Sequence, residues 1–330
     1  MTNPMQFTKF VGLGLTALVL AACGGGGSSG GSGTGLMSLA VTDSPIDDAK
    51  RVVVRFTHIE LKPRDGDRVL ICLDGEDAYV EESPRGRVSC PPAEVREIDL
   101  LALQGEDSAF LFEDLEVPAG EYSWIRFYLE PDEGASAPPL SNFATSSFIE
   151  FGGEYRENLI IPGGLQAGLQ LVSGFTVPED GLVSFTVDFD LRNAIRKDDE
   201  FPGYHRMRRA LRLVDNSNVG VITGTVNVGS YAELSAVAAT CTEDLARCPG
   251  LSVFVYEAGE ANDPPLTTAS VRHRMVNDGE YRYTVGFLSE GSYDLRLMYE
   301  VADALRELDA VNDVGVVAGA KTVVDFQEAD

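Results

Sequence analysis

Short apolar stretches that alternate with polar residues recur along most of this chain. They are rich in Val, Ile, Phe, Tyr and Thr, and clusters of Gly, Pro, Asp and Asn separate them. Alternation with a period of two is typical of strands that bury one face. Helical periodicity is weaker, and the best helix candidates are the short stretches 97–103 and 301–308. The pattern predicts an all-β protein built from two antiparallel β-sandwich domains.

A run of four polar turn-forming residues, 215–218, marks the junction between the two domains. It places a first β-sandwich-like domain at residues 36–215 and a second sandwich at residues 219–330. The turn Asn277-Asp278-Gly279 predicts a hairpin within the second domain. Strands are expected in that domain at residues 221–228, 251–257, 267–275, 280–287, 292–299, 314–317 and 322–326.

Two local features stand out within this pattern. In the predicted strand 50–61, the apolar phase changes between Phe56 and Ile59, which indicates a β-bulge. The stretch 63–92 that follows is acidic and predicted to be rich in loops.

A second feature links the domains, because the turns 117–122 and 288–293 each carry a Gly-x-Tyr sequence into a strand. This similarity suggests that the two sandwiches are built in related ways.

The N-terminus has the order of segments expected of an export signal. A polar start is followed by an apolar run at residues 10–20, which is shorter than the roughly 20 residues that span a bilayer. The sequence Leu20-Ala21-Ala22-Cys23 then resembles the bacterial lipoprotein signal, which implies cleavage before Cys23 and acylation of its thiol. An ordinary secretory signal is the alternative.

The lipoprotein interpretation divides the first part of the chain in two. Residues 1–22 are the signal peptide, and residues 23–35 are the lipidated cysteine with a flexible Gly/Ser linker. Acyl chains such as palmitate on Cys23 would hold the protein at a lipid bilayer. Because Gly24 rather than Asp follows the cysteine, resemblance to Gram-negative lipoproteins favours the outer membrane within the cell envelope.

Net charge and cysteine content agree with an exported protein. The formal charge of −26 argues against nucleic acid as a partner. With Cys23 acylated, the other four cysteines form two local pairs, Cys72 with Cys90 and Cys241 with Cys248. Disulfides are the default in an oxidising compartment. Zinc is a weaker alternative, since the spacings are not of the Cys-x-x-Cys kind and the three histidines are scattered.

Several motifs of the first domain resemble a known family. They are Thr42-Asp43-Ser44-Pro45, residues 118–122, residues 168–171, Gly174-Phe175 and residues 187–192. Together they are similar to the landmarks of the bacterial lipoprotein family called domain of unknown function 4382, over residues 36–214. The resemblance implies a β-sandwich-like exported domain and supplies no activity. The sequence departs from the family at residues 204–213, where Arg208-Arg209 stand in place of a Lys-Pro pair, which leaves the pairing of the closing strand open.

The second domain resembles a different group. The order of residues 220–226, 278–281 and 291–295 is similar to the carboxypeptidase-regulatory-like, prealbumin-like sandwich. Members of that group serve mostly as stalks, spacers or binding modules. The resemblance implies a domain without a catalytic cluster of its own.

The strand 184–190 carries the most suggestive polar residues. Phe185, Val187 and Phe189 would face the core, while Asp188 and Asp190 share the other face. Together with Asp43 or Asp47 they could bind Ca²⁺, which prefers oxygen ligands. The favoured alternative is ion pairing with the next strand, whose Arg206, Arg208 and Arg212 share one parity. The same three arginines could instead bind an anion such as a lipopolysaccharide phosphate.

These observations favour a non-catalytic binding or scaffolding module of the cell envelope. Its expected partners are the bilayer, through acylated Cys23, and an unidentified envelope protein or glycan. A Ca²⁺-stabilised adhesion or glycan-binding protein is the alternative, and Ca²⁺ is the only cofactor that the residues suggest. A hydrolase is a weaker possibility, because carboxylate pairs can be drawn anywhere in a chain with 52 acids.

Overall fold

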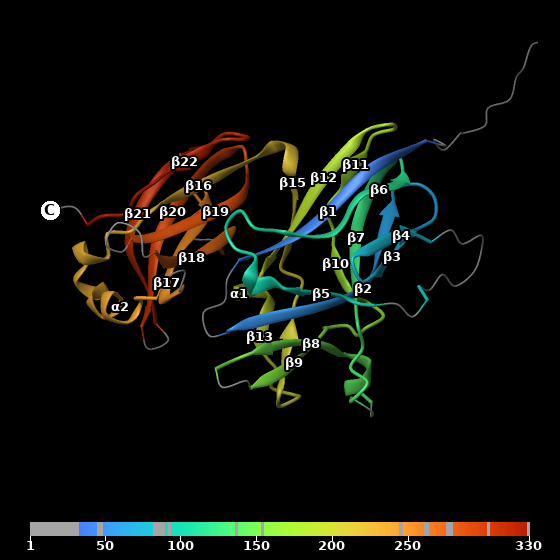
Figure 1. Cartoon of the computed structure of the whole chain (residues 1–330), viewed down its shortest axis with the longest axis horizontal. Helices are drawn as coiled ribbons and strands as arrows, with labels where there is room; N and C mark the ends of the chain where they lie inside the picture. The colour runs from blue at the N-terminus through green and yellow to red at the C-terminus, as the bar shows by residue number, and fades with distance from the viewer. Residues whose placement is uncertain are drawn as a thin grey trace, which may run out of the picture. The chain divides into compact units, whose positions relative to one another are not determined.

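The computed structural model describes most of the chain after the predicted linker (Figure 1). The described residues are 33–44, 49–81, 90–91, 94–135, 138–152, 155–243, 247–260, 264–274, 280–301 and 304–328. The predicted signal peptide, Cys23, Asp47 and the turn 277–279 lie outside them. The first strand begins at Thr34, so the last two residues of the predicted linker belong to the fold.

A four-stranded sheet forms one layer of the N-terminal sandwich. Its strand order is β15-β12-β1-β6, and Figure 1 shows β1 and β12 running side by side. The strands are β1 (Thr34–Ser44), β6 (Ala109–Pro118), β12 (Leu182–Asp190) and β15 (Leu211–Asp215). The pair β1 and β12 is parallel, whereas β1–β6 and β12–β15 are antiparallel.

The other layer is a larger sheet of eleven strands. Its main path runs β10-β7-β2-β8-β9-β14-β13, while β3 and β5 pair with β2, β4 with β3, and β11 with β7. The strands are β2 (Arg51–Pro63), β3 (Val69–Asp74), β4 (Asp77–Val80), β5 (Arg96–Asp99), β7 (Gly120–Leu129), β8 (Ala144–Glu150), β9 (Arg156–Ile160), β10 (Leu169–Leu171), β11 (Phe175–Val177), β13 (Ile195–Lys197) and β14 (Tyr204–Met207).

Three phenylalanines join the two layers at the centre of the core. Phe189 of β12 meets Phe56 of β2 and Phe127 of β7, with ring centroids 6.2 Å apart in both contacts. Phe185 and Val187 lie on the same face of β12 and are also buried, as the alternation predicts. The opposite face is buried too, since Thr186 and Asp188 are almost inaccessible to solvent.

The C-terminal part of the chain forms one seven-stranded sheet around a second hydrophobic core. Its order is β21-β20-β17-β18-β19-β16-β22. The strands are β16 (Val219–Thr225), β17 (Arg247–Glu257), β18 (Thr267–Arg274), β19 (Glu280–Ser289), β20 (Gly291–Val301), β21 (Ala304–Val316) and β22 (Lys321–Val323). Every strand predicted there is present, and β18 and β19 pair as an antiparallel hairpin.

Helices are few and short in the described residues. They are α1 (Leu191–Ala194), α2 (Ser235–Thr240) and the 3₁₀ turns η1 (Leu100–Ala102), η2 (Leu140–Asn142), η3 (Asn216–Asn218), η4 (Val228–Ser230) and η5 (Ala232–Leu234). None of them is long and apolar enough to cross a membrane.

The two helix predictions were wrong. Residues 96–99 are strand β5 and only 100–102 form a 3₁₀ turn, while residues 304–308 belong to β21. Ala, Leu, Arg and Glu in that stretch favour a helix, but pairing along β20 overrides this weak local preference. The prediction that 63–92 is mostly loop was also incomplete, because it contains the β3–β4 hairpin.

The all-β class is confirmed, with mixed rather than purely antiparallel sheets. Parallel pairing occurs in β1–β12, β9–β14 and β16–β22. The prediction that Arg206, Arg208 and Arg212 lie on one strand was wrong, because β14 pairs with β9 and β13 in one layer while β15 pairs with β12 in the other. Residues 208–210 therefore cross between the layers of the sandwich.

Candidate functional site: a groove beside the Cys72–Cys90 disulfide

A bulge in β2 creates the most developed site in the described residues. The register between β2 and β7 shifts between Phe56 and His58, which confirms the bulge predicted from the apolar phase change. Phe56 and Ile59 are both fully buried in the core. In a regular strand, one residue separates two side chains that face the core. Here two residues lie between Phe56 and Ile59, so both Thr57 and His58 face away from the core.

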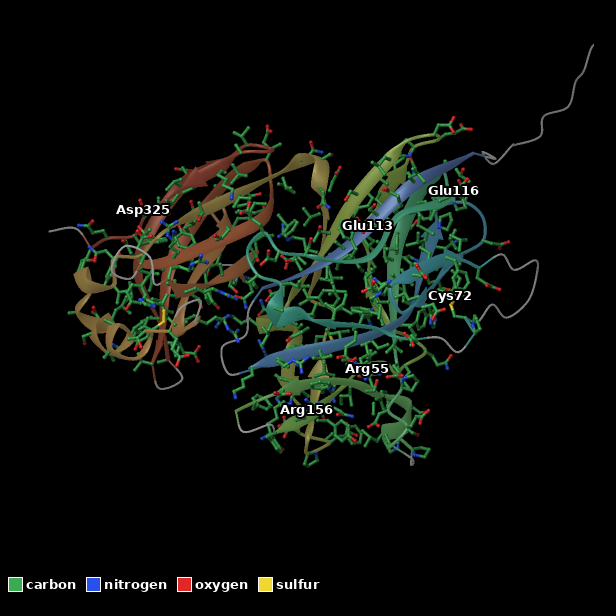
Figure 2. The ribbon with its side chains drawn as sticks, in the orientation of Figure 1. Arg55, Cys72, Glu113, Glu116, Arg156 and Asp325 are labelled. Carbon is green, nitrogen blue, oxygen red and sulfur yellow. A yellow bond between two sulfur atoms is a disulfide. The ribbon has the colours of Figure 1, made fainter. Side chains whose placement is uncertain are left out.

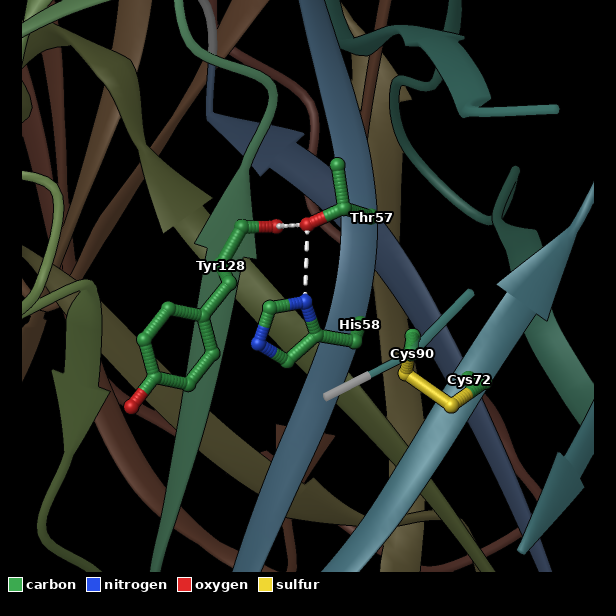
Figure 3. The surroundings of a disulfide bond; sticks show 5 residues. All are labelled: Thr57, His58, Cys72, Cys90 and Tyr128. Atoms are coloured by element: carbon green, nitrogen blue, oxygen red, sulfur yellow. Dashed lines mark hydrogen bonds between the residues drawn. A yellow bond between two sulfur atoms is a disulfide. The ribbon is translucent and has the colours of Figure 1, made fainter. Parts of the chain in front are cut away.

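The imidazole of His58 is held in a defined orientation (Figure 3). It stacks on the ring of Tyr128 from β7, with centroids 4.2 Å apart and 13° between the planes. The Thr57 hydroxyl donates to the Tyr128 carbonyl at 3.2 Å and lies 2.9 Å from Nδ1 of His58. A threonine hydroxyl has a single proton, so Nδ1 must be the donor in the second contact. The assigned tautomer leaves Nε2 of His58 as a hydrogen-bond acceptor.

Burial favours the neutral imidazole at this position. It lowers the pKa of His58 below its ordinary value, although the nearby Glu60 carboxylate opposes the effect. The shift favours the uncharged form of His58 at neutral pH. A neutral ring with a free acceptor nitrogen can receive a hydrogen bond from a hydroxyl or amine of a ligand.

Glu60, two residues further along β2, anchors the site. Its carboxylate accepts hydrogen bonds from Arg68 at 2.9 Å, from Arg126 at 3.3 Å and from the Tyr128 hydroxyl at 3.1 Å. Both guanidinium groups also lie over the ring of Trp124, at 5.6 and 4.6 Å from its centroid. This network fixes the tyrosine on which His58 stacks, so the aromatic pair is preorganised.

An open groove of about 650 Å³ extends over this pair. Its lining is Thr57, His58, Glu60, Leu70, Leu73, Cys90, Pro91, Glu94, Val95, Tyr128, Leu129, Glu130, Pro131, Leu165 and Gln166. Cys90 is bonded to Cys72 on β3, as predicted, so the disulfide ties one wall of the groove to the sheet. The volume lies within the range of small-molecule binding sites.

The groove is rich in hydrogen-bond acceptors. Glu130 pairs with Arg55, which Figure 2 labels on β2, at 2.8 Å and accepts a hydrogen bond from Ser146. Glu94 and Gln166 are exposed at the rim. None of the described lining residues is a lysine or arginine. The groove is therefore suited to a ligand that donates hydrogen bonds, and it disfavours an anion.

Of the three residues predicted for Ca²⁺, Asp188 and Asp190 have other partners. Asp188 faces Arg212 in the β12–β15 register, and their side chains pair at 2.8 Å. This confirms the favoured ion-pair interpretation for that pair. Asp190 caps α1 by accepting hydrogen bonds from the backbone and side chain of Asn193. Within the described part of the chain, no three His, Cys, Asp or Glu side chains are grouped to hold a metal ion.

Asp43 is the most unusual of these acids. It is 6% exposed, and neither carboxylate oxygen has a hydrogen-bond partner in the described residues. Burial, and then repulsion from Asp188, raise the pKa of Asp43 well above its ordinary value, while Arg247 opposes the shift. The Asp43 carboxyl group is thus held toward its protonated form. The Ca²⁺ prediction itself remains a prediction.

The three arginines predicted as an anion site do not share a face. Arg212 lies on β15 with Asp188, whereas Arg206 on β14 pairs with Asp198 at 2.5 Å. Arg208 is exposed on the segment that crosses between the layers. The expectation of a shared face was wrong because it assumed one uninterrupted strand, while anion binding by these arginines remains a prediction. Arg206 and Arg208 do line one small cavity of about 270 Å³ together with Arg209.

Sequence reasoning did not identify the groove. The bulge was the available signal, since bulges often redirect side chains at functional sites. What was missing is Tyr128, which is 70 positions along the chain from His58 and reaches it only through β2–β7 pairing.

The model of one protein family covers the groove. The match, to "Domain of unknown function (DUF4382)", extends over residues 34–205, slightly more than half of the 330-residue chain. The chain belongs to this family. The DUF4382 region contains the whole bulged strand β2, both cysteines of the first disulfide and Tyr128. It ends inside β14, within the segment where the sequence was expected to depart from the family.

Comparisons with curated proteins and with solved structures do not identify a function for this chain. No curated protein matches the chain. A leucine-rich repeat protein from Bacteroides thetaiotaomicron VPI-5482 is 12% identical over 90% of this chain, with a TM-score of 0.20, and the match spans only 26% of that protein. A candidate adhesin from Bacteroides ovatus ATCC 8483 is 10% identical over 94% of this chain and all of its own, with a TM-score of 0.23. The Bacillus anthracis TIE protein is 9% identical over 90% of this chain and 51% of its own, with a TM-score of 0.17. These similarities are too slight to bear on fold or function.

Proposed function

We propose that this protein is a lipid-anchored binding module of the bacterial cell envelope, and that the groove over His58 and Tyr128 is its ligand site. The sequence Leu20–Cys23 and the Gly/Ser stretch after it support acylation of Cys23 and a flexible tether. The disulfides Cys72–Cys90 and Cys241–Cys248 support export to an oxidising compartment. Within this proposal the C-terminal sheet is a carboxypeptidase-regulatory-like spacer, and the module is non-catalytic.

A single observation carries the ligand assignment. The groove combines a fixed aromatic pair with acceptor groups from His58, Glu60, Glu94 and Glu130. Neutral sugars have apolar faces that pack on aromatic rings and hydroxyl groups that donate to carboxylates. The described lining holds no lysine or arginine, and the arginines behind it are already paired with Glu60 and Glu130, so an acidic sugar or phosphate would find no free cation there. The groove therefore fits a neutral glycan of the envelope.

Titration calorimetry on the purified full chain tests this assignment. The probes are neutral oligosaccharides such as chitotetraose and maltotetraose, with a uronic-acid tetrasaccharide as the charged comparison. We expect at least one neutral probe to bind, and the uronic-acid probe to remain unbound. The variants E94A and Q166A, both at the exposed rim, should weaken binding several-fold, whereas E133A, exposed outside the groove, should not. Binding that is unchanged in both rim variants would contradict the proposal.

The anchor requires its own test, because a failed anchor leaves the groove proposal intact. In a bacterial host that processes lipoproteins, the full-length protein should fractionate with membranes and incorporate labelled palmitate. The variant C23S should lose both properties. A C23S protein that still carries the label would contradict acylation at this cysteine.

A further inference from the structure

Three arginines lie directly opposite one another across the C-terminal sheet. Arg247 of β17 is the register partner of Arg272 on β18, and Arg272 is in turn the partner of Arg282 on β19. Arg274 lies two residues further along β18, on the same face as Arg272. Like charges directly opposite in a sheet destabilise it, so an arrangement of this kind needs compensation by anions.

The protein supplies only part of that compensation. Arg282 pairs with Glu280 at 2.5 Å. The guanidinium of Arg272 donates to the neutral amide oxygen of Gln104, at 3.2 and 2.6 Å. Burial lowers the pKa of Arg272, and repulsion from Arg247 and Arg274 lowers it further against the attraction of Asp107. In the described residues no carboxylate forms an ion pair with Arg272 or Arg274.

These arginines line a cavity of about 730 Å³ that also contains unsatisfied hydroxyl groups. The side-chain oxygens of Thr268 and Ser270, on the same face of β18, are buried and have no hydrogen-bond partner in the described residues. Buried hydroxyls without partners cost free energy, so a bound ligand would satisfy them.

The charges around the cavity favour an anion. The lining includes Arg272, Arg274, Arg282 and Lys321, of which Lys321 pairs with Glu106 at 2.6 Å. Its acids are Asp107, which is exposed, and Asp43. Burial raises the pKa of Asp43, which favours the uncharged form of that carboxyl group.

We propose that this cavity binds a small sugar carrying a tetrahedral oxyanion, with Arg272 and Arg274 holding the oxyanion and Thr268 and Ser270 hydrogen-bonded to sugar hydroxyls. Arginine suits this role because its planar fork donates two parallel hydrogen bonds to such a group. The cavity is larger than an isolated phosphate requires and lies in the size range of small-molecule sites. This site is independent of the acceptor-rich groove in the DUF4382 region.

Calorimetry with the full chain tests the proposal, using glucose 6-phosphate, glucose 6-sulfate, inorganic phosphate and glucose as probes. The sugar phosphate or the sugar sulfate should bind. The probe with the higher affinity shows whether the cavity prefers a phosphate or a sulfate group. Inorganic phosphate and glucose should each bind at least about tenfold more weakly, since each makes only half of the contacts. Equal affinity for inorganic phosphate would overturn the assignment of a sugar.

Matched variants separate binding from folding. R272Q and R274Q should each weaken binding of the sugar phosphate or sulfate about tenfold. The control R64Q replaces an exposed arginine that pairs with Glu121 on the N-terminal sandwich, and it should bind with unchanged affinity. Without ligand, R272Q should melt no lower than the native chain, because it relieves repulsion between like charges. Normal binding by R274Q, or a destabilised R272Q whose binding is unchanged, would overturn the proposal.

Discussion

Tyr122 and Tyr293 make the same hydrogen bond in the two halves of the chain. The hydroxyl of Tyr122 donates to the carbonyl of Pro118 at 2.6 Å, and that of Tyr293 donates to the carbonyl of Ser289 at 2.8 Å. Each tyrosine lies at the start of a strand, four residues after its acceptor, as in the tyrosine corners of other sandwiches. The similarity between the two Gly-x-Tyr turns in the sequence therefore reflects a shared local structure.

Removing either hydroxyl should destabilise the protein by about 1 kcal/mol, because a partly buried hydrogen bond is lost. Burial raises the pKa of Tyr122 to about 12, so the hydroxyl remains a donor throughout the usual pH range. Urea unfolding of Y122F and Y293F measures the effect, and Y79F, at an exposed tyrosine, is the control. Wild-type stability of Y122F or Y293F would show that the corner contributes nothing.

The depressed pKa of His58 predicts a specific loss of stability in acid. Between the folded pKa and the ordinary value near 6.5, the unfolded chain binds a proton that the folded chain does not. The contribution of His58 is therefore fully present above about pH 6.5 and is lost as pH falls through the folded pKa. The difference in unfolding free energy between the native chain and H58Q, followed from pH 8 to pH 5, isolates this residue. A difference that does not change with pH would contradict the assigned burial.

The two disulfides should differ in what they support. Removing the Cys72–Cys90 bond, which closes a loop of 18 residues, should cost about 3 kcal/mol and weaken glycan binding, because Cys90 and Pro91 line the groove. Removing the Cys241–Cys248 bond should cost less, since it closes only seven residues, and should leave the groove unaffected. Serine variants of each pair, compared by urea unfolding and calorimetry, test both statements. If both serine variants lost glycan affinity equally, the loss would reflect general destabilisation of the protein and not a role of the Cys72–Cys90 bond in the groove.

Calcium provides a test of the acidic residues on β1 and β12. Since Asp188 is paired with Arg212 and Asp190 caps α1, we expect the melting temperature to be the same, within about 1 °C, in EDTA and in millimolar Ca²⁺. A rise of several degrees with Ca²⁺ would instead support a metal site at Asp43, Asp188 and Asp190. The variant D188N would then be expected to abolish the rise.

Local sequence pattern was sufficient to predict most strands of the C-terminal sheet, the bulge between Phe56 and Ile59, and both disulfides. It failed where distant residues decide the structure. Residues 304–308 form a strand because β20 offers a partner, and Arg206 and Arg212 separate because the chain changes layers between them. The stack of His58 on Tyr128 and the alignment of Arg247, Arg272 and Arg282 both depend on strand register. Periodicity shows which way a side chain faces, but it does not show which side chain lies opposite.

The most direct test of the groove is a side-chain NMR titration of the three histidines in the full chain. His58 lines the groove, whereas His205 pairs with Glu157 and His273 is buried on β18, so the latter two serve as internal controls. On addition of a neutral oligosaccharide, we predict a shift of the His58 Nε2 resonance as it accepts a ligand hydroxyl, with His205 and His273 unchanged. Binding that leaves His58 unshifted would place the ligand elsewhere and contradict the proposed function.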